Sequence, residues 1–146
     1  MIFSAFAKVK ILIALFQAIV VSVSFIDAGA QYSSPESVTY DSVTSNYFIS
    51  NTASRIILQR DRQGNVSEFV NVGSSIHGVT VHANKLYVCN GTRVRGYDIS
   101  NASETFNVQI SGSTFLNDLA IDASGMMYVS DFSARRIYKV NTATQE

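Results

Sequence analysis

The strongest constraint on this chain is an internal repeat with a period of about 40 residues. When the sequence is laid over itself, residues 47–50 align with residues 86–89 and then with residues 127–130. These segments read Tyr-Phe-Ile-Ser, Leu-Tyr-Val-Cys and Met-Tyr-Val-Ser. One structural unit is therefore expected to occur three times along the chain. The three copies cover approximately residues 36–72, 76–111 and 115–146.

The segments within each copy have the chemistry of β-strands. They are about four to six residues long, rich in Val, Ile, Tyr and Phe, and separated by Asn, Gly and Ser. No stretch after residue 30 shows a helical period. Four short antiparallel strands per copy at this spacing are typical of a β-propeller blade. Because the third copy stops before its fourth segment, we predict an all-β, incomplete β-propeller of about 2.75 four-stranded blades.

An incomplete propeller leaves two blade faces uncovered. Each blade normally buries both faces against its neighbours, which explains the nearly continuous apolar runs in this sequence. We interpret the chain as a truncated product of a longer gene. The alternative is self-association, in which copies of the chain pack through their open blade faces.

The N-terminus has the pattern of a cleavable signal peptide covering residues 1–30. Two lysines precede an almost entirely apolar run at residues 11–25, and residues 28–30 (Ala-Gly-Ala) have the small-x-small pattern of a cleavage site. An uncleaved membrane anchor is the alternative, but about 15 apolar residues fall short of the roughly 20 that a span needs. The mature domain, residues 31–146, is predicted to begin at Gln31 and to be secreted, with no membrane segment after cleavage.

The balance of charge narrows the class of partner. The chain has 11 basic and 11 acidic residues, and its formal net charge is 0. Nucleic acids and anionic lipid surfaces attract proteins with a clear excess of basic residues. Neither is therefore an expected partner of this chain.

Two residue types relate to passage through the secretory pathway. Cys89 is the only cysteine, which excludes an internal disulfide. We interpret it as a small buried strand residue, with a reactive or intermolecular thiol as the alternative. Three Asn-x-Ser/Thr sequons predict N-glycosylation at Asn65, Asn90 and Asn101.

A polar residue recurs just before the first strand of each copy: Glu36, His77 and Asn117. The first strand of a blade lines the central channel, so these side chains are predicted to meet at the channel mouth. Ca²⁺ prefers carboxylate and amide oxygens, whereas an imidazole beside such an ion suits the role of a base. Each residue also has a structural alternative: a solvated glutamate, a histidine bonded to backbone in a tight turn, and an Asx-turn at Asn117 and Asp118.

Several of these segments resemble known propellers. Residues 35–41 (Pro-Glu-Ser-Val-Thr-Tyr-Asp) and 115–122 (Phe-Leu-Asn-Asp-Leu-Ala-Ile-Asp) are similar to SMP-30/gluconolactonase-like propellers. Residues 76–79 (Ile-His-Gly-Val) are similar to the His-Gly segment of paraoxonase-type arylesterases. The resemblance covers nearly all of residues 35–141, and NHL and strictosidine-synthase-like propellers carry related blades. It implies a six-bladed propeller with a central Ca²⁺, whose members hydrolyse lactones, aryl esters or organophosphates.

The resemblance also implies roles for particular residues. Glu36 and Asn117 would be metal ligands, His77 would be a catalytic histidine, and Asp118 would be a supporting neighbour in the catalytic site. Leu119 stands where many SMP-30 members have glycine. The later blades, which supply the remaining Asn and Asp ligands in such families, are absent from this sequence.

The leading functional hypothesis is a secreted, truncated SMP-30/paraoxonase-like propeller. Its parental activity would be Ca²⁺-dependent hydrolysis of a small-molecule lactone or ester. One alternative is a non-catalytic binding module of the NHL or strictosidine-synthase type, which holds a partner protein or glycan; another is an inactive fragment. Asp61, Asp98 and Asp131, which lie near strand ends, are interpreted as solvated turn residues.

Overall fold

The computed structural model describes residues 32–146. The predicted signal peptide and Gln31 lie outside the described residues. Within residues 32–146, no helix is long and apolar enough to cross a membrane. All the regular structure described is β-strand, which confirms the predicted fold class.

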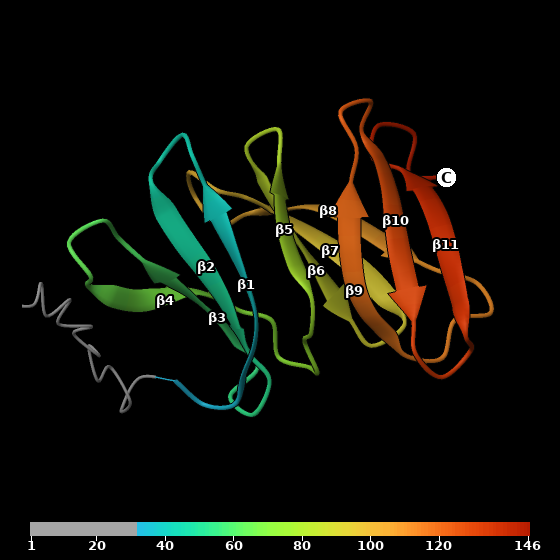
Figure 1. Ribbon diagram of the computed structural model, residues 1–146, viewed down its shortest axis with the longest axis horizontal. Helices are drawn as coiled ribbons and strands as arrows, with labels where there is room; N and C mark the ends of the chain where they lie inside the picture. The colour runs from blue at the N-terminus through green and yellow to red at the C-terminus, as the bar shows by residue number, and fades with distance from the viewer. Residues whose placement is uncertain (1–31) are drawn as a thin grey trace, which may run out of the picture.

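Three antiparallel sheets follow one another along the chain, each with its strands in sequence order (Figure 1). Blade 1 consists of β1 (Pro35–Asp41), β2 (Asn46–Asn51), β3 (Ile56–Arg60) and β4 (Val66–Asn71). Blade 2 consists of β5 (Val79–His82), β6 (Lys85–Asn90), β7 (Arg93–Asp98) and β8 (Glu104–Gln109). Blade 3 consists of β9 (Leu116–Ile121), β10 (Met126–Asp131) and β11 (Arg136–Asn141). The third blade has three strands, as predicted.

Local turn chemistry explains why consecutive strands pair. His82 pairs with Lys85, so β5 and β6 are joined by the two residues Ala83 and Asn84. Both have positive φ, 47° and 60°, which is the conformation of the hairpin turn whose twist matches that of the flanking strands. The β9–β10 turn instead uses Gly125 at a φ of 82°, where a side chain would be strained.

The first strands of the three blades lie side by side. β1 packs against β5, and β5 packs against β9. In Figure 1 these three strands stand next to each other and point in the same direction, while β3 and β4 of blade 1 lie away from β5 and β9. The N-terminal ends of β1, β5 and β9 therefore share one edge of the molecule.

Two apolar cores hold the blades together. The core between blades 1 and 2 contains Phe48, Ile57, Val72, Ile76, Val79, Leu86, Val88, Tyr97 and Ile99. The core between blades 2 and 3 contains Tyr87, Cys89, Val94, Phe106, Ile110, Leu116, Leu119, Met127, Val129 and Val140. Successive residues of β6 thus enter different cores, because side chains alternate across a strand and both faces of blade 2 are covered.

Candidate functional site

Glu36 and Asn117 occupy the same structural position in blades 1 and 3. The β1–β2 register shifts between Pro35 and Ser37, which leaves Glu36 as an extra residue in β1. The β9–β10 register shifts in the same way around Asn117. Both residues lie inside their strands and not just before them, so that detail of the prediction was wrong. The strands begin earlier because a β-bulge accommodates the extra residue without ending the pairing.

His77 has the corresponding position in blade 2, two residues before β5. Its N–H donates to the carbonyl of Cys89 at 3.0 Å, and the Cys89 N–H donates to the carbonyl of Gly78 at 3.0 Å. Two residues therefore face one, as in a bulge. A bulge redirects side chains at a strand end. The same irregularity occurs at the corresponding position of all three blades, where the polar residues lie.

Hydrogen bonds between blades hold these positions together. The Val79 N–H donates to the Ser37 hydroxyl at 3.2 Å, which joins blade 2 to blade 1. The Gly78 N–H donates to the Asn117 carbonyl at 2.8 Å, which joins blade 2 to blade 3. The spacing of the three bulges is therefore set by one backbone–side-chain and one backbone–backbone hydrogen bond.

Glycine is required at position 78 by its neighbours. A Cβ there would lie 2.6 Å from the Asp118 Cα and 2.8 Å from the Asn117 carbonyl oxygen, both closer than real Cβ contacts. Blade 1 has Ser37 and blade 3 has Asp118 at the same repeat position. Only in blade 2 does the backbone of the next blade occupy the space of a side chain.

Charged groups from all three blades share one electrostatic environment. Partial burial raises the pKa of Glu36 above its usual 4.5, the nearby charge of His77 lowers it, and the carboxylate of Asp118 raises it. The net effect is a raised Glu36 pKa. The structure thus brings His77 and Asp118 near enough to Glu36 to affect its pKa.

The three polar residues differ in exposure. Glu36 is exposed, Asn117 is half-buried, and His77 is 9% exposed. The His77 ring packs edge-on against Phe115, with ring centroids 4.6 Å apart. Among the described residues, no hydrogen-bond partner reaches the buried His77 Nδ1. A buried ring nitrogen without a partner is uncommon.

The loop that carries His77 is anchored by a residue that sequence reasoning assigned differently. Asn90 is 5% exposed. Its Nδ2 donates to the Ser74 hydroxyl at 2.7 Å and to the Ser75 carbonyl at 2.8 Å. A glycan on this nitrogen would disrupt both hydrogen bonds, so Asn90 suits the role of loop anchor better than that of glycosylation site. Asn65 and Asn101 are exposed, and glycosylation at either stays a prediction.

Asp131 anchors the equivalent loop in blade 3. The interpretation of Asp131 as a solvated turn residue was wrong, since it is 2% exposed. Burial favours a higher pKa for Asp131, but hydrogen bonds from Ala134, Thr114 and Phe115 outweigh this effect and lower the pKa to about 2. The carboxylate therefore fixes the segment that leads into Asn117.

A signal for these anchors was present in the repeat. Asn51, Asn90 and Asp131 occupy the last position of the second strand in every copy, and all three are buried. Ser50 and Ser130, one residue earlier, each accept the N–H of a bulge residue through the hydroxyl, from Ser37 at 3.0 Å and from Asp118 at 3.1 Å. Comparing polar positions at the ends of the second strands would have found this set.

Cys89 replaces the serine in blade 2. It is fully buried, and burial raises the pKa of its thiol, as do the charges of Asp118 and Glu36. Because the thiolate is the reactive form, this cysteine is chemically inert in the folded chain. Its position in the core between blades 2 and 3 agrees with its interpretation as a buried strand residue.

Oxygen donors dominate the accessible part of the mouth. Within residues 32–146, no group of three or more His, Cys, Asp or Glu side chains lies close enough together to hold a metal ion. The carboxylate and amide side chains at this edge include those of Glu36, Asn117 and Asp118. Such a set can bind a hard cation together with water, or accept hydrogen bonds from a polar ligand.

Blades built from sequential antiparallel strands, with their first strands adjacent, define the class: this chain is a partial β-propeller.

No family model and no curated protein matches the sequence. A chain from the crystal structure of a nidogen/laminin complex is similar in structure, with a TM-score of 0.70 and 16% identity over 77% of this chain and 46% of that chain. A gluconolactonase from Xanthomonas campestris has a TM-score of 0.66 and 18% identity over the same shares of the two chains. Hydrazine synthase from Kuenenia stuttgartiensis has a TM-score of 0.69 and 22% identity over 84% of this chain and 38% of that chain.

These similarities confirm the propeller fold. The identities of 16–22% show the fold alone, and the SMP-30 family is not shown by them. This chain spans less than half the length of each of the three structures.

Proposed function

We propose that the mouth formed by β1, β5 and β9 is a Ca²⁺-assisted site for hydrolysis of a small lactone or ester, in a secreted propeller. The observation that carries this proposal is the repeated bulge, which sets Glu36, His77 and Asn117 at one edge on three successive blades. Bulges next to active sites commonly redirect functional side chains. The resemblance to the gluconolactonase fold supports the same reaction class.

The donor chemistry of the mouth fits a hard cation. Glu36, Asn117 and Asp118 offer carboxylate and amide oxygens, and Glu36 already has a raised pKa that a nearby cation would lower. Three side chains are fewer than the roughly six to eight oxygens that Ca²⁺ takes, so water or further protein groups would complete the shell. When bound, the ion would polarise the carbonyl of the substrate. We expect weak binding, with a Kd on the order of 10⁻⁴–10⁻³ M.

His77 would handle the proton in this reaction. Its Nδ1 has no hydrogen-bond partner among the described residues, and Phe115 holds the ring in place. A neutral imidazole within reach of a water molecule would take its proton as the water attacks the carbonyl carbon. The ester C–O bond would then break, and the imidazole would return the proton to the leaving oxygen. Asp118 would be a supporting neighbour of His77 in this reaction.

Calcium titration tests the cation site. At a calcium concentration of about 100 times the Kd, binding stabilises the folded state by about 2.7 kcal/mol, which raises Tm by roughly 10 °C for a domain of this size. Glu36→Gln and Asn117→Ala should each abolish this rise. Glu68→Gln is the matched control, because Glu68 is exposed on the outer strand β4. A melting curve unaffected by calcium would contradict the cation site.

A panel of lactones and aryl esters then tests catalysis. Turnover above the buffer rate that requires calcium and is lost in His77→Gln would support the proposed reaction. Calcium-dependent stabilisation without turnover would favour the alternative, a binding propeller. The nidogen/laminin complex shows that the fold also occurs in a protein-binding context.

A further inference from the structure

The positions that pack one blade onto the next recur in every repeat. We define the forward face of a blade by two residues. The first is the third residue of the second strand. The other lies on the third strand and pairs with the fifth residue of the second strand. These positions are Phe48 and Ile57 in blade 1, Tyr87 and Val94 in blade 2, and Tyr128 and Ile137 in blade 3. In blades 1 and 2 they lie within the cores shared with the following blade.

The forward face of blade 3 is equally apolar but uncovered. Tyr128 is 40% exposed and Ile137 is 73% exposed. Their counterparts in blade 2, Tyr87 and Val94, are at most 2% exposed. Solvent-facing terminal repeats normally carry polar side chains on the outer face. The forward face of blade 3 instead carries apolar side chains, like those of an internal blade interface.

The rear face of blade 1 shows the same property. Val38 is 63% exposed and Tyr47 is 40% exposed. Their counterparts in blade 2 are Val79, at 5%, and Leu86, at 0%, both buried against blade 1. Those in blade 3, Leu119 and Met127, are buried against blade 2. The two ends of the chain thus present the two complementary halves of a blade junction.

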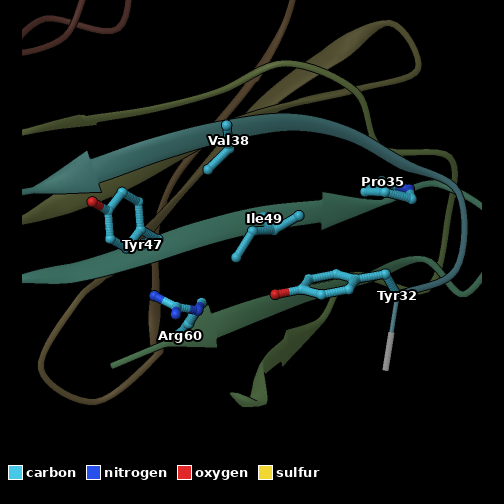
Figure 2. A pocket seen from close by; sticks show the side chains of 6 residues that line it. All are labelled: Tyr32, Pro35, Val38, Tyr47, Ile49 and Arg60. Carbon is cyan, nitrogen blue, oxygen red and sulfur yellow. The ribbon is translucent and has the colours of Figure 1, made fainter. Parts of the chain in front are cut away.

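Each open face is also hollowed. Pro35, Val38, Tyr47 and Ile49 surround a depression of about 350 Å³ on blade 1, together with Tyr32 and Arg60. Figure 2 shows these six side chains gathered on one face of β1, β2 and β3. A depression of about 220 Å³ on blade 3 is lined by residues that include Tyr128 and Ile137.

We infer that two copies of this chain associate head to tail, with the forward face of blade 3 in each copy covering the rear face of blade 1 in the other. The two internal junctions already pair these same kinds of face. This chain covers 46% of two of the similar chains and 38% of the third, so two copies would supply about three quarters or more of the length of each. Two heterologous junctions related by a twofold axis close into a ring instead of continuing as a filament.

Closure would place two copies of the channel mouth around one axis. Gly78 lies against Asn117 of the next blade. By repeat equivalence, Asp118 of one copy would lie beside Glu36 of the other. The ring would therefore hold two glutamates, two asparagines and two aspartates at the mouth. The inferred association rests on the apolar faces, and it stands whether or not the mouth binds a cation.

Oligomeric state in solution tests this inference. The full chain, secreted from a eukaryotic host, is examined by light scattering after size exclusion, once with a chelator and once with Ca²⁺. We expect twice the monomer mass in at least one condition at micromolar concentration. Ile137→Asp and Val38→Asp should each reduce the mass to that of the monomer. Val43→Asp is the control, because Val43 is 86% exposed but lies in the β1–β2 turn, away from both faces.

Mixing the two variants identifies the head-to-tail arrangement. Ile137→Asp retains an intact rear face and Val38→Asp retains an intact forward face, so their mixture should form dimers through one junction. A single cooperative melting transition in each variant would show that both variants fold. A wild-type monomer in both buffers up to about 100 μM would overturn the inference. An Ile137→Asp monomer with an unaffected Val38→Asp dimer would overturn the head-to-tail pairing.

Discussion

Replacing Gly78 with alanine should separate blades 2 and 3 at the channel mouth. The added Cβ would lie 2.6 Å from the Asp118 Cα and 2.8 Å from the Asn117 carbonyl oxygen. Both atoms belong to the backbone, so no side-chain rotation relieves the contact. Strands β5 and β9 must therefore move apart by several tenths of an ångström or more.

The magnitude follows from what this movement breaks. The Gly78 N–H to Asn117 carbonyl bond, now 2.8 Å, would lengthen toward the limit of a hydrogen bond, which costs about 1 kcal/mol. Overpacking in a tight contact adds about 1–3 kcal/mol. We expect Gly78→Ala to lower the free energy of unfolding by about 2–4 kcal/mol and Tm by roughly 10 °C.

Urea denaturation followed by circular dichroism measures this change, with Gly112→Ala as the control. Gly112 has a φ of 75° and no atom within 4 Å of the added Cβ, so its replacement costs only the backbone strain of about 1 kcal/mol. If Gly78→Ala were no more destabilising than Gly112→Ala, the close approach of β5 to β9 would be refuted.

Three further predictions concern groups around the mouth. Asp131 has a folded pKa of about 2, below its usual 3.8. Its contribution to stability is therefore present above about pH 4 and is lost as pH falls toward 2. The urea midpoint should fall less steeply with acid in Asp131→Asn than in the wild type. Glu36 has a raised pKa, so its ionisation opposes folding above pH 4.5. Without calcium, Glu36→Gln should therefore be at least as stable as the wild type at pH 7. A clear loss of stability at that pH would contradict the raised pKa. The buried Cys89 thiol should resist alkylation at pH 8 in the folded chain and react promptly in denaturant, as followed by mass spectrometry; rapid native labelling would contradict its burial.

Strand content could be predicted from sequence because local chemistry determines it. The apolar segments at residues 47–50, 86–89 and 127–130 form the centres of β2, β6 and β10. The period of the repeat then indicated how the strands are grouped into blades. No knowledge of distant contacts was needed, since each strand pairs with its immediate neighbours in the chain.

The bulges could not be predicted because they depend on pairing register. Whether Glu36 precedes β1 or is an extra residue within it is decided by the pairing of its neighbours Pro35 and Ser37 with β2. The candidate set of Glu36, His77 and Asn117 was found correctly as a repeat position, while its backbone geometry required the structure.

The loop anchors were missed because they act over long sequence separations. Asp131 holds Thr114, 17 residues earlier, and Asn90 holds Ser75, 15 residues earlier. In the sequence, Asp131 reads as a turn residue and Asn90 as part of a sequon. Burial, which no local pattern shows, determines the role of each.

The central claim is that residues from three blades share one channel mouth, and the pKa of Glu36 tests it most directly. Carbon-detected NMR of the side-chain carboxyl in calcium-free buffer should show Glu36 titrating above 4.5. Asp118→Asn should lower this pKa and His77→Gln should raise it, while Asp61→Asn, in the turn between β3 and β4, should leave it unchanged. A Glu36 that titrates at its usual value, indifferent to both His77 and Asp118, would contradict the shared mouth.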